Sequence, residues 1–240
     1  MGKEVLRDQK LWFGGRDLTG VMNSLGLDYG ADAVEDTTFG QQTHTFQGGL
    51  KSVAASHQGF FDAAAYEADL FDNVGVDGVP MSYSGPDAAE GAVAFTFQSM
   101  ESQYAPGGSV GEMMGFSLAA AAAGDLIRGT LGANRSAASS SGNSAAFQLG
   151  AVGAAQKLYG VLHVTEVAGT LPTLDVTIES DDASGFASPT TRITFAQKTA
   201  RGYEWATPID GAIADDWWRV AWTIGGTTPA FTFACILGIQ

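Results

Sequence analysis

Residues 23–61 read NSLGLDYGADAVEDTTFGQQTHTFQGGLKSVAASHQGFF, and the pattern in this stretch decides the fold class. Its first part alternates between apolar residues and small or acidic ones, with the period of a β-strand that buries one face. The apolar side of this alternation holds Val21, Leu25, Leu27 and Tyr29. Residues 52–61 repeat the alternation and predict a second strand. Residues 39–49, which lie between, contain three glycines and several polar side chains, so they predict a long loop.

The rest of the chain predicts further β-structure and one short helix, over residues 62–73, with Asp62 as its cap. Further strands are predicted over 93–100, 112–118 with the alanine run that follows, 158–167, 173–179, 191–198, 217–224 and 230–239, and residues 125–131 close the first half of the chain. The fold class is therefore all-β with one short helix. The later strands, separated by turn signals, indicate a C-terminal β-sandwich of the jelly-roll kind.

A run of small polar residues divides the chain into two predicted domains. Residues 134–144 read NRSAASSSGNS, a composition typical of a flexible linker or an exposed loop. We therefore expect a first domain over residues 1–132, a Ser-rich linker or loop over 133–144, and a C-terminal domain over 145–240. The alternative that both halves are variants of one fold stays open.

Composition limits the functional classes. The formal net charge is −14, and the twelve Lys and Arg residues are scattered along the chain, which argues against a nucleic-acid-binding surface. Only 16% of the residues are charged. A surface poor in charge and rich in small residues suits a protein that buries its outside against copies of itself, although many β-sandwiches share this composition.

The sequence holds no constellation of catalytic or metal-binding residues. His44, His57 and His163 lie far apart and outside any zinc-binding spacing, and the single cysteine, Cys235, sits in an apolar run. The pair Asp181–Asp182 offers oxygen ligands for calcium, but two carboxylates in a Ser/Gly turn are more often a solvated loop. We expect no enzyme activity, no metal and no cofactor.

Neither a signal peptide nor a membrane span is predicted. The N-terminal residues MGKEVLRDQKLWFGG contain no apolar core of sufficient length, and the longest bland run, residues 118–123, is far too short to cross a bilayer. We expect the chain to be made and folded in a cytoplasm.

The order of elements over residues 21–73 resembles that of the major tail tube proteins of long-tailed bacteriophages. A long strand of the type MNSLGLDYGADAVEDTT, a glycine-marked loop, a strand of the type GLKSVAASHQGFFDA and a short helix follow one another. The later GEMMGFSLAAAAAGDLIRG is similar to the closing strands of that fold. The resemblance covers about the first half of the chain and implies a tail-tube β-sandwich or barrel there.

The resemblance also implies a function and partners. Hexameric rings of the chain would stack into a hollow tube in the virion tail, assembled in the host cytoplasm with other tail proteins, and phage DNA would pass through without specific binding. Paired strands of neighbouring copies would form the barrel around the channel. The channel-lining candidates are Asp28, Asp32, Asp36, Ser52, Ser56 and Gln58. The inter-ring loop candidates are Phe39, Gln41, Gln42, His44 and Phe46.

Two other classes of function compete with this interpretation. Trp205, Trp217 and Trp218 in the C-terminal part suggest a carbohydrate-binding module, in which Trp205 and Trp217 are the candidates for exposed aromatic residues. Alternation places Trp217 opposite Trp218, so at least one of them is expected to face outward or into an interface. The other competitor is a different virion part, such as a capsid decoration or a tail terminator protein.

Overall fold

The computed structural model describes residues 9–85 and 88–240, and the fold is all-β with a single short helix. The first eight residues of the N-terminal stretch discussed above lie outside the described part. The described residues form two compact units. The larger unit comprises the described residues of Met1–Gly20, Val79–Phe97 and Ile127–Gln240, and the smaller unit comprises Val21–Gly78 and Gln98–Leu126.

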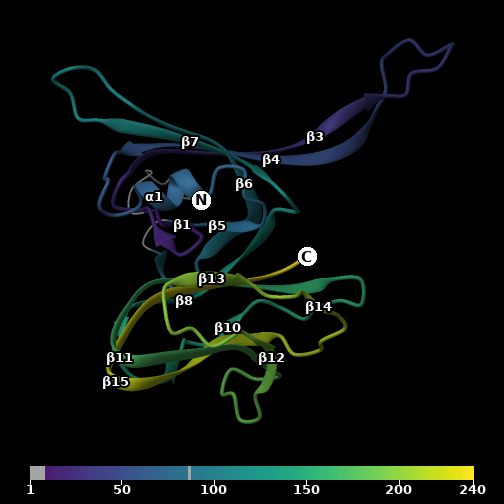
Figure 1. Cartoon of the computed structure of the whole chain (residues 1–240). Helices are drawn as coiled ribbons and strands as arrows, with labels where there is room; N and C mark the ends of the chain where they lie inside the picture. The colour runs from purple at the N-terminus through teal and green to yellow at the C-terminus, as the bar shows by residue number, and fades with distance from the viewer. Residues whose placement is uncertain (1–8, 86–87) are drawn as a thin grey trace. The chain divides into compact units, whose positions relative to one another are not determined.

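The smaller unit is a four-stranded antiparallel sheet with one helix (Figure 1). Its strand order is β3-β4-β7-β6. Its elements are β3 (Met22–Glu35), β4 (Phe46–Phe60), α1 (Glu67–Asp72), the second part of β6 (Val93–Gly107) and β7 (Gly115–Ala122). The alanine run continues β7, as the sequence predicts.

One face of this sheet is covered. Val53, Ala55 and His57 of β4 point to the covered side and are buried, and Phe116, Leu118 and Ala120 of β7 lie beside them. The segment before and within α1 supplies Tyr66 and Leu70, both buried, and the ring of Tyr66 lies 5.6 Å from that of Phe116. Burying a large apolar side chain stabilises the fold by about 2 kcal/mol, so this small cluster fixes the covered face.

The larger unit is built around two very long paired strands, β11 (Lys157–Asp181) and β15 (Trp217–Ile239). Its other strands are β1 (Leu11–Phe13), β2 (Arg16–Asp17), β5 (Val79–Ser84), the first part of β6, β8 (Ile127–Ala138), β9 (Gly142–Asn143), β10 (Phe147–Gln148), β12 (Thr190–Thr194), β13 (Gly202–Trp205) and β14 (Ile209–Asp210). The main strand order is β12-β11-β15-β8-β6-β5-β1-β2.

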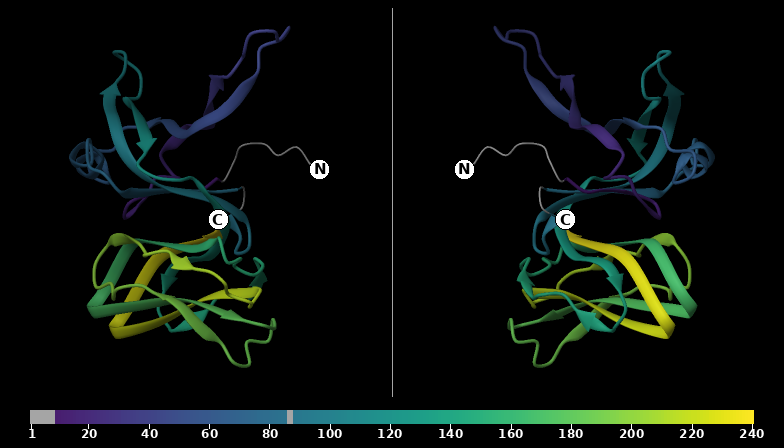
Figure 2. Two further views of the ribbon diagram at one scale, coloured as in Figure 1. Left: turned by 90° about the vertical axis from the view of Figure 1, so that its right-hand side faces the viewer. Right: turned by 90° about the vertical axis from the view of Figure 1, so that its left-hand side faces the viewer.

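The β11–β15 ribbon bends sharply in the middle (Figure 2). Register shifts between Val164 and Thr173 mark the bend, and Gly169 and Gly226 adopt the positive φ that glycine tolerates best. Bending brings the two halves of the ribbon face to face. The core between them contains Leu162, Val164, Leu174, Val176, Ile178, Trp218, Val220, Trp222, Phe231, Phe233 and Cys235.

The structure differs from the sequence expectations at several boundaries. Residues 133–138, expected in a linker, belong to β8, where Ala133 is fully buried, and each compact unit combines separate segments of the chain. The two strands expected over 158–167 and 173–179 are one bent strand, β11. The helix is shorter than the sequence predicts, because residues 63–66 form a turn before it. Long-range pairing decides these points, and local composition does not report it.

Candidate assembly surface

The sheet of the smaller unit has two open edges. Among the described strands, β3 pairs with β4 alone over its whole length. At the other edge, β6 carries an isolated bridge between Glu101 and Val74, and beyond Glu101 it pairs with β7 alone. Each edge presents unpaired backbone N–H and C=O groups, which can accept a strand from another chain.

The uncovered face of the sheet, called the outer face here, carries small and polar side chains. In β3 and β4 the register pairs Ser24 with Gln58, Gly26 with Ser56, Asp28 with Ala54 and Gly30 with Ser52. Residues opposite each other in a ladder share a face. The outer face continues into β7 through Ser117, Ala119 and Ala121. At these paired positions the outer face carries no large apolar side chain and no cation.

The register brings most of the predicted channel-lining residues together. Asp28, Ser52, Ser56 and Gln58 lie on the outer face, and Asp32 lies on the same side of β3 by alternation. Asp36 follows the last residue of β3. Its carboxylate accepts a hydrogen bond from Nε2 of Gln47 at 2.7 Å, and hydrogen bonds from Thr45 and Gln47 lower its pKa. Whether these residues line a channel stays a prediction.

Beyond the four-stranded part, residues 29–35 of β3 and residues 46–52 of β4 form a two-stranded arm that extends away from the sheet (Figure 1). The residues of this arm are exposed on both faces. A ribbon of two strands is at best marginally stable in water. The large exposed apolar side chains of the arm and its end are Tyr29, Val34, Phe39, Phe46 and Leu50. Apolar groups clustered on a projecting ribbon are typical of a surface that packs against another protein.

The predicted inter-ring residues lie at the end of this arm, with one change of element. Phe39 is fully exposed, Gln42 is exposed, and Oε1 of Gln41 accepts hydrogen bonds from Thr38 and Thr45. His44 Nδ1 lies 2.6 Å from a carboxylate oxygen of Glu35.

Phe46 belongs to β4, and the prediction of a loop extending to residue 49 is wrong. The ladder continues through the glycines because a register shift opposite Ala31 and Ala33 absorbs one extra residue of β4.

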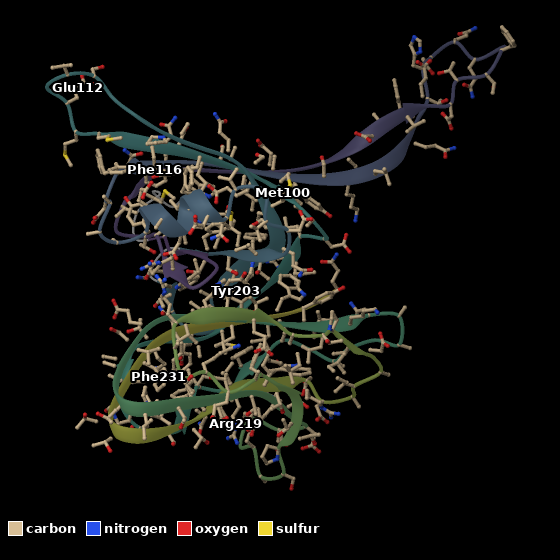
Figure 3. The ribbon with its side chains drawn as sticks, viewed as in Figure 1. Met100, Glu112, Phe116, Tyr203, Arg219 and Phe231 are labelled. Carbon is tan, nitrogen blue, oxygen red and sulfur yellow. The ribbon has the colours of Figure 1, made fainter. Side chains whose placement is uncertain are left out.

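A second projecting segment was missed by the sequence analysis. Residues 108–114 join β6 to β7, and Val110, Met113 and Met114 in this loop are exposed. Figure 3 shows Glu112 at the tip of the loop, away from the packed part of the smaller unit around Phe116. An apolar triplet within the glycine-flanked GGSVGEMMG is the signal that could have identified it.

The covered face holds an unusual carboxyl group. Glu101 is fully buried, and neither of its carboxylate oxygens has a hydrogen-bond partner among the residues that the structure describes. Burial raises the pKa of Glu101 to about 8. Burial likewise raises the pKa of Tyr104 to about 12, with Glu67, Tyr66 and Glu101 adding to the shift. Glu101 is therefore protonated at neutral pH and acts as a polar but uncharged part of the core.

The tryptophans of the larger unit do not form an open aromatic platform. Trp218 is fully buried, and its Nε1 donates a hydrogen bond to the carbonyl of Gly150 at 2.8 Å. Trp217 is half-buried, on the opposite side of the strand. Trp205 is also half-buried and meets the ring of Tyr159 edge-on at 6.3 Å. A role for Trp205 and Trp217 in sugar binding stays a prediction.

The remaining polar clusters have structural partners. One carboxylate oxygen of Asp181 accepts a hydrogen bond from the backbone N–H of Ala183 and the other from that of Ser188, so this buried side chain shapes its own loop. Nε2 of His163 lies 2.8 Å from the hydroxyl of Ser82, and burial lowers the pKa of this histidine to about 4. Within residues 9–85 and 88–240, no group of three or more His, Cys, Asp or Glu residues could hold a metal ion. Nor does the described part contain a helix long and apolar enough to span a membrane.

No protein-family model matches the chain, and no curated protein matches it. Several solved structures are similar to it. In the virion of a native gene transfer agent particle, the matching chain is 18% identical, with 52% of this chain and 98% of that chain covered and a TM-score of 0.44.

In the sheath/tube terminator of PVC, an extracellular contractile injection system, the matching chain is 12% identical. The match covers 53% of this chain and 97% of that chain, with a TM-score of 0.45. The Dit protein (gp 19.1) of phage SPP1, described as a paradigm of the hub adsorption apparatus, is 11% identical. The match covers 98% of this chain and 100% of that chain, with a TM-score of 0.37. At these identities and TM-scores the similarities assign the chain to no family.

Proposed function

We propose that this chain is a structural subunit of a phage-type tail, in which copies join edge to edge into hexameric rings that stack into the tail tube. The observation that carries the proposal is the sheet β3-β4-β7-β6, which leaves one open edge at each side and one uncovered face. The number of copies and the location in the virion tail rest on the resemblance of residues 21–73 to tail tube proteins.

The strand directions support a closed ring. Neighbouring strands in β3-β4-β7-β6 are antiparallel, so β3 and β6 run in opposite directions. In a rotationally symmetric ring every copy has the same orientation, so β6 of one copy would meet β3 of the next in antiparallel pairing. Closing the ring would consume both open edges, which otherwise recruit other chains at random.

The outer face suits a channel for DNA. Two charged residues of β3, Asp28 and Asp32, lie on the outer face, and both are acidic. Carboxylates repel phosphates, so a duplex would slide past this wall, whereas lysine and arginine would hold it. At physiological salt the screening length is about 8 Å, which confines the repulsion to DNA close to the wall. No enzyme activity and no cofactor belong to this function.

Electron microscopy of the purified full-length protein tests the proposal. We expect hollow tubes built of stacked rings, assembled without a template or a cofactor. If the protein forms closed rings that never stack, the chain would instead be assigned to another structural component of the tail. A protein that stays monomeric at every concentration, or that forms only small asymmetric oligomers, would overturn the proposal.

Two variants, one in β3 and one in the larger unit, connect the result to the open edge. Leu27 lies in the middle of β3 and is half-buried, and Leu171 lies on an exposed bend of β11 in the larger unit. Proline has no N–H to donate, so Leu27→Pro should prevent ring closure. Leu171→Asp, a polar change in the larger unit, should leave ring closure unchanged. Circular dichroism checks that both variants remain folded.

A further inference from the structure

The smaller unit carries two tips whose large apolar side chains are left exposed by the residues that the structure describes. The first, called the arm tip here, is residues 37–45 between β3 and β4, and its Phe39 is fully exposed at 108% of the reference area. The second, called the Met loop here, is residues 108–114 between β6 and β7. Val110 in the Met loop is likewise exposed at 108% and Met113 at 73%. Leaving such side chains in water is unfavourable by about 25 cal/mol for each Å² of apolar surface.

The topology places the two tips at opposite ends of the strands. Since β3 and β7 are each antiparallel to β4, they run in the same direction. The arm tip follows the end of β3, whereas the Met loop precedes the start of β7. The two tips therefore point in opposite directions along the sheet, as Figure 1 shows for the β3–β4 arm and the β6–β7 connection.

Charge restricts where two copies of this unit can approach each other. The smaller unit contains twelve Asp and Glu residues and one basic residue, Lys51. The arm tip, TTFGQQTHT, contains no carboxylate, and the Met loop contains only Glu112. Contacts between these two segments would avoid most of the repulsion between the units. Methionine side chains are flexible and polarisable, so the Met loop can adapt its shape to an aromatic ring.

We infer that the Met loop is the docking site for the arm tip of a second copy of this chain, in the adjacent ring of the stack. The inference rests on the proposed function, because only copies stacked with the same orientation bring the arm tip of one ring to the Met loop of the next. Phe39 is the anchor, and Val110, Met113 and Met114 form the surface that receives it. This contact sets the direction of growth, since each ring offers arm tips at one end and Met loops at the other.

Site-directed cross-linking tests the inference. The chain has a single natural cysteine, Cys235, which is fully buried and whose thiol pKa is raised by burial, so it is inert toward a maleimide. Assembled Gln42→Cys/Glu112→Cys protein, which keeps Phe39 and Met113, should give a ladder of linked chains when treated with a short bismaleimide. Each single variant should give none. Both positions are exposed, so the substitutions should leave the fold unchanged.

A matched control uses another exposed apolar residue of the same unit. Phe71 is 67% exposed on α1, and Gln42→Cys/Phe71→Cys should give no ladder. In preparations that form tubes, a ladder from this control or none from Gln42→Cys/Glu112→Cys would overturn the docking inference and leave the tube intact. Absence of rings and tubes in the parent protein would overturn the proposed function itself.

A second variant gives an independent readout. Val110→Asp/Met113→Asp places carboxylates where the aromatic ring docks, so rings should still form while stacking weakens. The concentration needed for stacking should rise by at least about tenfold, which corresponds to about 1.4 kcal/mol. Tubes of this variant that form at the parent's concentration would contradict the inference.

Discussion

Folding transfers the carboxyl group of Glu101 from water to a site where no described residue offers it a hydrogen bond, and stability should depend on pH for this reason. Its pKa rises from 4.5 to about 8 on folding. The folded protein therefore keeps a proton that the unfolded chain loses above pH 4.5. Stability is full below that pH and falls by about 1.4 kcal/mol per pH unit until the pH reaches the folded pKa.

Urea denaturation of the parent and of Glu101→Gln between pH 5 and pH 8 measures this effect. Gln cannot ionise, so the variant should gain stability relative to the parent as the pH rises. The comparison cancels the contribution of the buried residues His57 and His163, whose pKa values burial lowers to about 4. Glu112→Gln, an exposed control, should show no such trend. A difference between parent and Glu101→Gln that is constant with pH would contradict the prediction.

Gly129 is required by the close approach of two strands in the larger unit. A Cβ at this position would overlap the backbone carbonyl of Leu237, and backbone atoms cannot move aside as a side chain can. Gly129→Ala should therefore lower the free energy of unfolding by roughly 1–3 kcal/mol or more, the usual result of overpacking. Gly30→Ala, where a Cβ meets nothing within 4 Å, should cost much less. Equal thermal melting of the two variants would contradict this explanation.

At the scale of the element, β3 is the edge strand that also carries the acidic side chains of the outer face. Asp28→Lys/Asp32→Lys reverses the charge without touching the covered face, so tubes should form as in the parent. DNA delivery should fall strongly, because lysines would hold phosphates instead of repelling them. Infectivity of a phage carrying the variant is the measurement. The infectivity of the neutral control, Asp28→Asn/Asp32→Asn, should lie between that of the parent and that of the lysine variant. Full infectivity of the lysine variant would contradict the channel assignment.

For the whole molecule, charge is distributed unevenly between the two units. The smaller unit holds twelve of the 26 carboxylates but only one of the twelve Lys and Arg residues, leaving 14 carboxylates and 11 cations for the larger unit. Assembly of the smaller units must therefore overcome strong electrostatic repulsion. Salt weakens this repulsion, with a screening length of about 10 Å at 0.1 M. Assembly followed by light scattering should become faster as NaCl rises from low to physiological concentration. Assembly that slows over this range would show that attraction between charges drives it.

The elements were predictable where the pattern was local and periodic. Alternation over residues 21–29, 52–61 and 217–224 predicted strands and their faces, and Trp218 is buried while Trp217 is half-buried. Gly48 and Gly49 predict a loop, because a sequence does not reveal that a bulge can accommodate them in a strand. The composition of residues 133–144 predicts a linker, whereas Ala133 is buried where β8 pairs with Cys235 of β15, far later in the chain.

The candidate site was predictable in part for the same reason. Asp28, Ser52, Ser56 and Gln58 were grouped from alternation, and the register places them on one face. Glu101 was not identified, because the segments that pair with β6 at this residue, β7 and the bridge at Val74, come from other parts of the chain. The Met loop was not identified either, since exposure is a property of the folded surface.

The order of residues sufficed to specify an all-β chain, the faces of its regularly alternating strands and an excess of acidic residues, because side-chain alternation and charge are local properties. Only the folded structure decided which strands stay at an edge, which carboxyl group loses its water, and that the two apolar tips lie at opposite ends of one sheet. These features depend on which segments pair across long stretches of chain, and hydrogen bonds between strands carry no signature in any single window of sequence.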